Sequence, residues 1–88
     1  MSDSLPQLTM YGAMWCPSVV MARARLNREG IPFVYKDIDR DPGAMDELFA
    51  LRGKAWVVPT FVMPNGSVLD NPPIQRVIEQ LDLTEPTA

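Results

Sequence analysis

The feature that most constrains the fold is the alternation of strand and helix patterns in the first half of the chain. Residues 8–11 form a short apolar run that predicts a strand. Apolar side chains then recur at helical spacing over residues 18–29, and β-branched and aromatic residues at 33–38 predict a second strand. Pro17 suits the first position of the helix, and Gly30 suits its left-handed end. Two strands joined through a helix form a parallel pair with a right-handed crossover.

The second half of the chain predicts another helix, a hairpin and a last helix. Asp41 predicts an N-cap, and Pro42 the first helical position after it. The apolar face of this helix is expected at Met45, Leu48 and Phe49.

Apolar runs at residues 60–63 and 67–69 flank Asn65-Gly66, a pair that favours a tight hairpin turn. The last helix is expected to follow a cap at Asp70 or Asn71. Its apolar side chains, spaced three and four residues apart, are Ile74, Val77, Ile78 and Leu81.

The predicted order β-α-β-α-β-β-α gives an α/β fold, with a mixed four-stranded sheet flanked by three helices. A length of 88 residues leaves room for a single domain over residues 1–88, with a core at about 7–82 and short tails at both ends, the second from residue 84. A net charge of −3 without a basic run argues against nucleic acid and membrane surfaces as partners. The start of the sequence lacks the pattern of a secretory signal, and one cysteine cannot form an internal disulfide. We therefore expect a monomer in the reducing cytoplasm.

Cys16 lies where the first strand gives way to the first helix. The free N–H groups and the positive dipole end of a helix stabilise a thiolate there, which favours a nucleophile. Trp15 can shield one side of the sulfur. The alternative is a cysteine that packs in the core as a small apolar residue. We favour the reactive cysteine because parallel sheets place their binding crevices at this end of a strand.

Pro59 stands at the start of the third predicted strand, where a proline marks an edge, a strand start or a special peptide bond. A cis bond after Val58 would turn the Val58 N–H and C=O outward, where they could pair with a substrate backbone. An ordinary trans proline is the alternative, and it is the commoner one.

Three motifs resemble the glutaredoxin family: residues 10–17 (MYGAMWCP), 57–60 (VVPT) and 65–72 (NGSVLDNP). The resemblance covers residues 8 to about 81 and is strongest to the mycoredoxin branch and to the glutaredoxin-like electron donors of ribonucleotide reductase. It implies a thioredoxin fold and a catalytic Cys16 that attacks mixed disulfides. It further implies a cis Pro59 facing Cys16, thiol-binding contacts at Trp15 and Pro17, and a Val58 backbone that grips the thiol cofactor. Asp70 is then expected near the far end of that cofactor.

The sequence departs from dithiol glutaredoxins at Val19, which stands where they have a second cysteine. The motif is Cys-Pro-Ser-Val, so a second thiol molecule or a reductase must complete each cycle. The motif also differs from the Cys-Gly-Phe-Ser of cluster-binding members. Because one chain supplies one thiolate, an iron–sulfur cluster is not expected.

The stretch before Cys16 carries no charge, whereas glutathione users place a lysine there. This favours a thiol with fewer carboxylates, such as mycothiol, over glutathione, or a protein partner. Met14 and Trp56 are possible contacts on the rim of the site, although partial burial of Trp56 is the favoured alternative. Arg52 and Lys54, in the segment before Pro59, could take the place of that lysine, but the favoured interpretation is that they are solvated charges at a helix end.

The remaining patterns are interpreted structurally. Five carboxylates are interpreted as side chains on solvated faces or as caps: Asp37, Asp39, Asp41, Asp46 and Glu47. The methionines are read as filler of the core or surface, and they are Met10, Met21, Met45 and Met63. The chain has no histidine, and no metal ligands are expected.

The leading hypothesis is a monothiol thiol–disulfide oxidoreductase. It would act on oxidised or thiolated proteins and be recycled by a low-molecular-weight thiol (mycothiol or glutathione) or a disulfide reductase. One alternative is a thioredoxin-fold binding module that has lost turnover. Another is a redox sensor or iron–sulfur carrier in which Cys16 links two chains.

Overall fold

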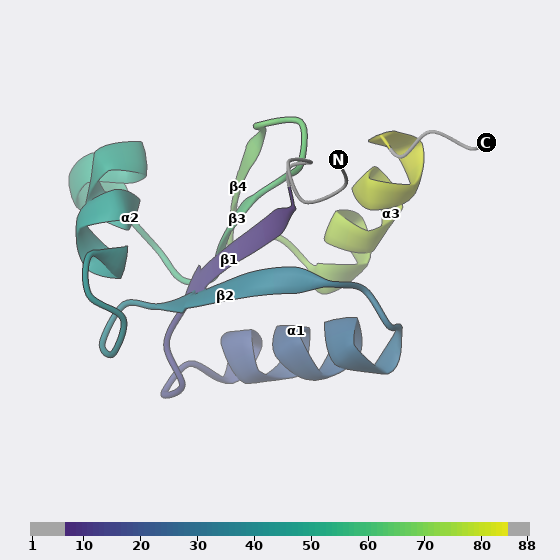
Figure 1. Cartoon of the computed structure of the whole chain (residues 1–88), viewed down its shortest axis with the longest axis horizontal. Helices are drawn as coiled ribbons and strands as arrows, with labels where there is room; N and C mark the ends of the chain where they lie inside the picture. The colour runs from purple at the N-terminus through teal and green to yellow at the C-terminus, as the bar shows by residue number, and fades with distance from the viewer. Residues whose placement is uncertain (1–6, 85–88) are drawn as a thin grey trace.

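The computed structural model describes residues 7–84, so the predicted tails at 1–6 and 85–88 lie outside the described residues. The elements are β1 (Leu8–Gly12), α1 (Pro17–Arg28), β2 (Phe33–Asp37), α2 (Ala44–Arg52), the 3-10 turn η2 (Gly53–Ala55), β3 (Thr60–Val62), β4 (Val68–Asp70) and α3 (Ile74–Thr84). This order confirms the predicted α/β architecture (Figure 1). Thr84 is not the start of a tail, because it is the last residue of α3.

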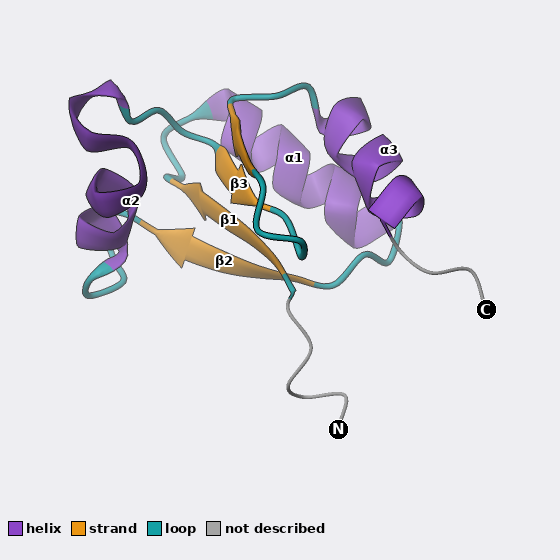
Figure 2. Cartoon of the chain, turned by 90° about the horizontal axis from the view of Figure 1, so that it is seen from above, coloured by secondary structure: helices purple, strands orange, loops and turns teal. Residues whose placement is uncertain are grey.

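The four strands form one mixed sheet in the order β2-β1-β3-β4 (Figure 2). β1 and β2 run parallel, in register from Leu8 opposite Phe33 to Gly12 opposite Asp37. β3 runs antiparallel to both β1 and β4. The carboxyl ends of β1 and β2 therefore lie beside the amino end of β3, at the same end of the sheet. The loop with Cys16 lies at that end.

Different helices cover the two faces of the sheet. Successive residues of a strand point to opposite faces, so their contacts show which helix lies on which side. Met10 of β1 joins the main core, to which α1 contributes Val19, Ala22 and Leu26. Val77 of α3 is buried in the same core, so α1 and α3 share one face. Tyr11, the next residue of β1, instead donates a hydrogen bond to Glu47 of α2 over 2.8 Å. α2 therefore covers the opposite face.

α2 begins later than the sequence predicts, at Ala44 after the left-handed Gly43 (φ 82°). The Asp41 carboxylate does not cap it, because it accepts the backbone N–H of Asp37 over 2.8 Å. The expected apolar face is correct only in part: Leu48 is buried as predicted, but Ala44 is the second buried residue, Met45 is half-buried and Phe49 is 49% exposed. The two buried residues stand four positions apart, which places them on one side of this nine-residue helix.

α3 begins at Ile74, and neither Asp70 nor Asn71 caps it. Asp70 is the last residue of β4, and the Asn71 N–H donates to the carbonyl of Pro59 over 2.8 Å. The Pro73 carbonyl accepts the N–H groups at the start of the helix instead. The apolar residues predicted for α3 all lie in or against the core: Ile74, Val77, Ile78 and Leu81.

The hairpin predicted at Asn65-Gly66 is present, with Gly66 at φ 92° and the Met63 N–H bonded to the carbonyl of Ser67 over 2.8 Å. Among the methionines, Met10 and Met63 belong to the core. In the part of the chain that is described, no helix has both the length and the apolar character needed to cross a bilayer.

Candidate active site

Cys16 occupies the N-cap position of α1, directly after the loop that follows β1. Its N–H donates to the carbonyl of Ala13 over 3.1 Å, which closes the loop into a tight turn. Its carbonyl accepts the N–H groups of Val19 and Val20 over 3.0 and 3.2 Å. These bonds fix the backbone at the point where the strand becomes a helix.

The Cys16 sulfur is half-buried and packs against the main core. It lies 3.7 Å from the carbonyl oxygen of Val58, to which its S–H donates. No amide of α1 donates to the sulfur, although the sequence predicts such bonds. Pro17 has no N–H to donate, and the N–H groups of Val19 and Val20 bond the Cys16 carbonyl instead of the sulfur. The amide of Ser18 is the first-turn donor that has no partner among the described residues.

The segment opposite Cys16 is held by its own hydrogen bonds. The Val58–Pro59 peptide bond is cis, as the family resemblance implies. The Thr60 hydroxyl donates to the carbonyl of Val57 over 2.7 Å, and the Pro59 carbonyl accepts the N–H of Asn71 over 2.8 Å. Pro59 and Thr60 are buried, so the segment is anchored from the inside.

The two large residues before Cys16 are exposed, and each has a partner on another element. Trp15 is 64% exposed, and its indole N–H donates to the Asp39 carboxylate over 2.7 Å. Met14 is 47% exposed, and an N–H of Arg23 lies 2.7 Å from its sulfur. The Arg23 guanidinium also stacks on the ring of Tyr35, 4.2 Å from its centre. The active-site loop is thus tied both to α1 and to the segment that follows β2.

Arg52 is the last residue of α2 and is partly exposed, as expected for a charge at a helix end, and it is paired with Asp70. The Arg52 Nε donates to the Asp70 carboxylate over 2.7 Å, and another of its N–H groups reaches the carbonyl of Val68 over 3.3 Å. Asp70 lies opposite Thr60 in the β3–β4 register, one residue beyond Pro59. Lys54 is exposed and Trp56 is half-buried in the segment between Arg52 and Val58.

A family model described as Glutaredoxin matches residues 8–61, which is more than half of the chain and includes both Cys16 and Pro59. The chain belongs to the glutaredoxin family. No curated protein matches the sequence.

Solved structures show the fold that goes with this family. The thioredoxin-like protein BC3987 superposes with a TM-score of 0.69 at 21% identity, covering 85% of this chain and 99% of that one. Glutaredoxin from Brucella melitensis gives 0.60 at 20% identity, covering 91% and 86%. The holo form of glutaredoxin C1 from Populus tremula x tremuloides gives 0.60 at 14% identity, covering 91% and 78%. The predicted thioredoxin fold is therefore correct.

Sequence reasoning missed the role of the carboxylates at the end of β2 and just after it in this glutaredoxin-family site. Asp37 is 5% exposed, not solvated. Its carboxylate accepts the N–H groups of Asp39 and Arg40 over 2.8 and 3.2 Å, which orients Asp39 toward Trp15. An Asp that bonds the N–H two residues on is the signature of an Asx turn, so the Asp37-x-Asp39 spacing was the available signal.

A tyrosine lies next to a carboxylate on each side of this end of the sheet. Burial, and after it the charge of Asp37, raise the pKa of Tyr35 to about 12. Burial, and after it the hydrogen bond to Glu47, raise the pKa of Tyr11 to about 12. Hydrogen bonds from Lys36 and then from Tyr11 hold the pKa of Glu47 below its usual value. Glu47 is therefore a paired carboxylate, and it is exposed to solvent as the sequence interpretation has it.

Metal ligands do not gather at this site. Within residues 7–84, no three side chains of Cys, Asp or Glu lie close enough together to hold a metal ion.

Proposed function

We propose that the protein is a monothiol thiol–disulfide oxidoreductase that reduces mixed disulfides between proteins and a low-molecular-weight thiol. The observation that carries the proposal is the position of the Cys16 sulfur, at the start of α1 and 3.7 Å from the Val58 carbonyl oxygen. Membership of the glutaredoxin family supports the general reaction class.

The reaction needs two exchange steps. The Cys16 thiolate attacks the sulfur of the low-molecular-weight thiol in the mixed disulfide, and the target protein leaves as a thiolate that takes a proton from water. Cys16 is then disulfide-bonded to the thiol. A second molecule of the thiol, as its thiolate, attacks this bond, which releases the Cys16 thiolate and a disulfide of two thiol molecules. A disulfide reductase returns that product to the thiol.

The second step is intermolecular because position 19 holds a valine. Val19 is fully buried, with its methyl groups against Gly12, and it offers no sulfur that could attack Cys16. The sequence has no other cysteine. This composition supports a monothiol cycle over a dithiol one.

We propose mycothiol as the preferred co-substrate over glutathione, which places the chain near the mycoredoxin branch. Residues 12–15 carry no charge, and the nearby guanidinium of Arg52 is already paired with Asp70. A thiol with few carboxylates therefore suits the approach to the sulfur. The Val58 N–H has no partner among the described residues and is free to receive the thiol's amide carbonyl.

The wider assignment follows from the same chemistry. We propose a cytoplasmic monomer whose partners are thiolated proteins and a reductase. We assign it no resident metal or iron–sulfur cluster, because a single cysteine supplies one thiolate of the four that a cluster needs.

The test is mass spectrometry of Cys16 after incubation with a mycothiolated peptide and, separately, with a glutathionylated one. The expected result is an adduct on Cys16 with release of the peptide thiol, faster for mycothiol, and no adduct on the Cys16→Ser variant. Absence of any adduct would contradict the proposal. If the Cys16→Ser protein still bound its protein partner unchanged, the chain would instead be a thioredoxin-fold binding module, the second candidate that Val19 favours.

A further inference from the structure

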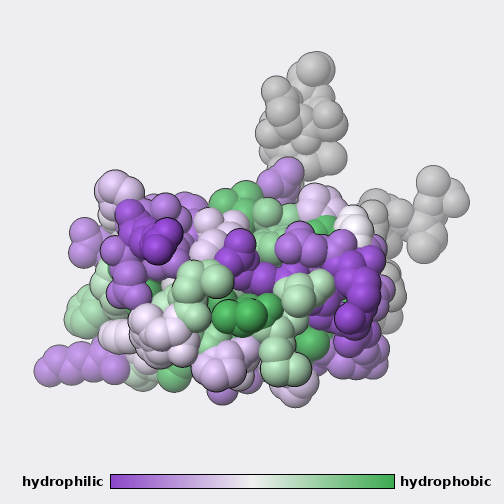
Figure 3. All heavy atoms as spheres, turned by 90° about the horizontal axis from the view of Figure 1, so that it is seen from below, coloured by the Kyte–Doolittle hydropathy of each residue, from purple (hydrophilic) through white to green (hydrophobic). Residues whose placement is uncertain are grey.

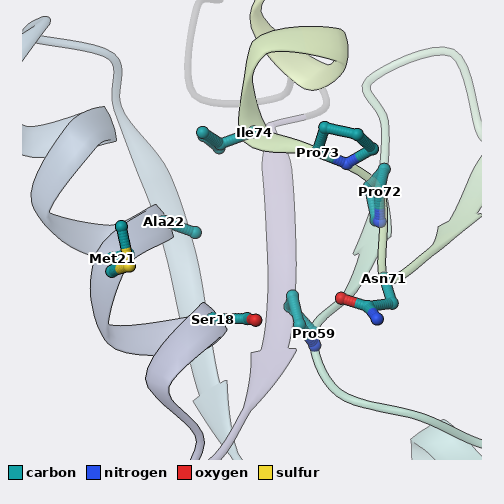
Figure 4. Close-up of a pocket in the computed structure, with 8 residues that line it drawn as sticks. All are labelled: Ser18, Met21, Ala22, Pro59, Asn71, Pro72, Pro73 and Ile74. Atoms are coloured by element: carbon teal, nitrogen blue, oxygen red, sulfur yellow. The ribbon is translucent and has the colours of Figure 1, made fainter.

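A groove opens beside the candidate active site, between the start of α1 and the start of α3 (Figure 4). It encloses about 330 Å³. Its lining residues are Ser18, Met21, Ala22, Pro59, Asn71, Pro72, Pro73 and Ile74. A second hollow of about 230 Å³ shares Met21 and Ile74 with the first and reaches Arg25 and Arg28. Because they share these two residues, the hollows adjoin and form one path along α1, and its first part is lined by Pro59 and by Ser18, two residues after Cys16.

The chemistry of this path changes along its length. None of the eight residues around the first hollow is charged, and Met21 presents 71% of its surface to solvent there. At the far end, the charge of Arg25 is already balanced by Glu29 over 2.7 Å. Arg28 is exposed and makes no ion pair with any residue in the described range. Figure 3 shows hydrophobic side chains in the middle of the face that α1 lies on, with hydrophilic ones on both sides of them.

We propose that this groove holds the polypeptide of the thiolated partner on one side of its modified cysteine. The inference rests on the proposed function and names the substrate's side of the site. An apolar side chain of the partner packs on Met21 and Ile74, and a carboxylate of the partner pairs with Arg28. We assign the groove to a protein substrate because it begins at Pro59, beside the sulfur that the partner's disulfide must reach, and ends at an unpaired cation.

The spacing along α1 fixes where these partner residues lie. A helix rises about 1.5 Å per residue, so Met21 lies roughly 7.5 Å and Arg28 roughly 18 Å along the axis from Cys16. An extended chain advances about 3.3 Å per residue. The apolar residue is therefore expected about two positions from the modified cysteine, and the acidic residue about five positions from it.

This placement agrees with the exchange chemistry. In the first step the low-molecular-weight thiol becomes bonded to Cys16 and stays on the Val58 side, and the partner's cysteine leaves as a thiolate. A partner held in the groove is thus the leaving group and departs without crossing the thiol. No further reactant is needed.

The test compares exchange rates at Cys16 for mycothiolated peptides with Leu at about the second and Asp at about the fifth position from the cysteine. The peptides are made in both chain directions, and a matched series has Lys in place of Asp. In the preferred direction, the acidic peptide should react about two- to fivefold faster than the Lys peptide, which is the range of an exposed ion pair. Arg28→Glu should reverse this order, whereas Arg76→Glu, the same charge change outside the groove, should keep it.

The apolar contact is tested in the same assay. Met21→Ser should slow the Leu peptide severalfold, because Met21 would lose its apolar contact with the peptide. Val20→Ser is the matched control, since Val20 is 42% exposed on the same helix but does not line the groove.

The mixed disulfide of mycothiol with free cysteine reports the chemistry at Cys16 without the groove. All four variants should react with it at the wild-type rate. If the peptides react no differently from this small disulfide, the groove assignment is wrong and the proposed function stands. Sedimentation that shows a dimer abolished by Met21→Glu would also overturn it, because a second copy would then cover the groove. If neither peptides nor small disulfide react, the proposed function itself fails.

Discussion

Replacing Gly12 with alanine should destabilise the protein through one steric conflict behind the active-site loop. A Cβ at position 12 would lie 2.7 and 3.0 Å from the two methyl carbons of Val19 and 3.1 Å from a ring carbon of Tyr35. Ordinary carbon–carbon contacts are about 3.5–4.0 Å. The added methyl group therefore has to displace its neighbours.

Neither neighbour can move easily. Val19 is fully buried and β-branched, so its side chain has few alternative rotamers. Tyr35 is held by its hydrogen bond to Asp37 over 3.3 Å and by the guanidinium of Arg23. Overpacking of such a site costs about 1–3 kcal/mol. Alanine also lowers the chain entropy of the unfolded state, which stabilises the protein by about 0.4–1 kcal/mol, so the midpoints of the two ranges give a net destabilisation of about 1.3 kcal/mol.

Urea unfolding of Gly12→Ala, Val19→Ala and the double variant measures this directly. Val19→Ala alone should also destabilise the protein, by leaving a cavity. The double variant should cost at least about 1 kcal/mol less than the sum of the two single variants, because the alanine at 19 gives the new methyl room. Strict additivity, or a Gly12→Ala protein as stable as the wild type, would refute the steric reasoning.

Three further predictions follow from the contacts of the site. Val19→Cys should allow an internal disulfide with Cys16, and the variant should gain the ability to reduce protein disulfides. Thiol titration should find no free thiol after oxidation, and free thiols that persist would contradict this prediction. Asp37→Ala should cost about 1–3 kcal/mol in urea unfolding, because the N–H groups of Asp39 and Arg40 lose a buried acceptor, whereas Asp46→Ala on the exposed face of α2 should have little effect. Tyr11 has a pKa of about 12 when folded against 10.0 ordinarily, so the stability that its neutral form contributes is complete below pH 10 and is lost as the pH rises toward 12. Tyr11→Phe should make the unfolding free energy fall less over that range, and an unchanged fall would exclude Tyr11 as its source.

The sequence predicts the fold well because its apolar residues are periodic and its turns carry specific residue types. Ile74 and Val77 lie three residues apart, and both face the core, since that spacing places them on one side of a helix. Gly66 and Gly30 mark turns at positive φ, where other residues are strained. Cys16 and Pro17 mark the start of α1, because a proline suits the first position of a helix.

The polar contacts of the site could not be predicted, because they join residues that are distant in the chain and follow no period. Trp15 and Asp39 are separated by two elements, and so are Arg52 and Asp70. Local signals also failed where two partners compete for one group. Asp41 reads as a helix cap, but its carboxylate serves the backbone of Asp37 instead.

The ties on the active-site loop bear on how the protein would meet a ligand. Trp15 is fastened to Asp39 and Met14 to Arg23, while the backbone between them is closed by the Cys16 to Ala13 hydrogen bond. Side chains that are already held in one rotamer lose little conformational entropy when a ligand binds, so this loop is preorganised. Selectivity among thiols would then depend on the shape of the thiol, since a rigid loop cannot change its conformation to accommodate a thiol that fits poorly.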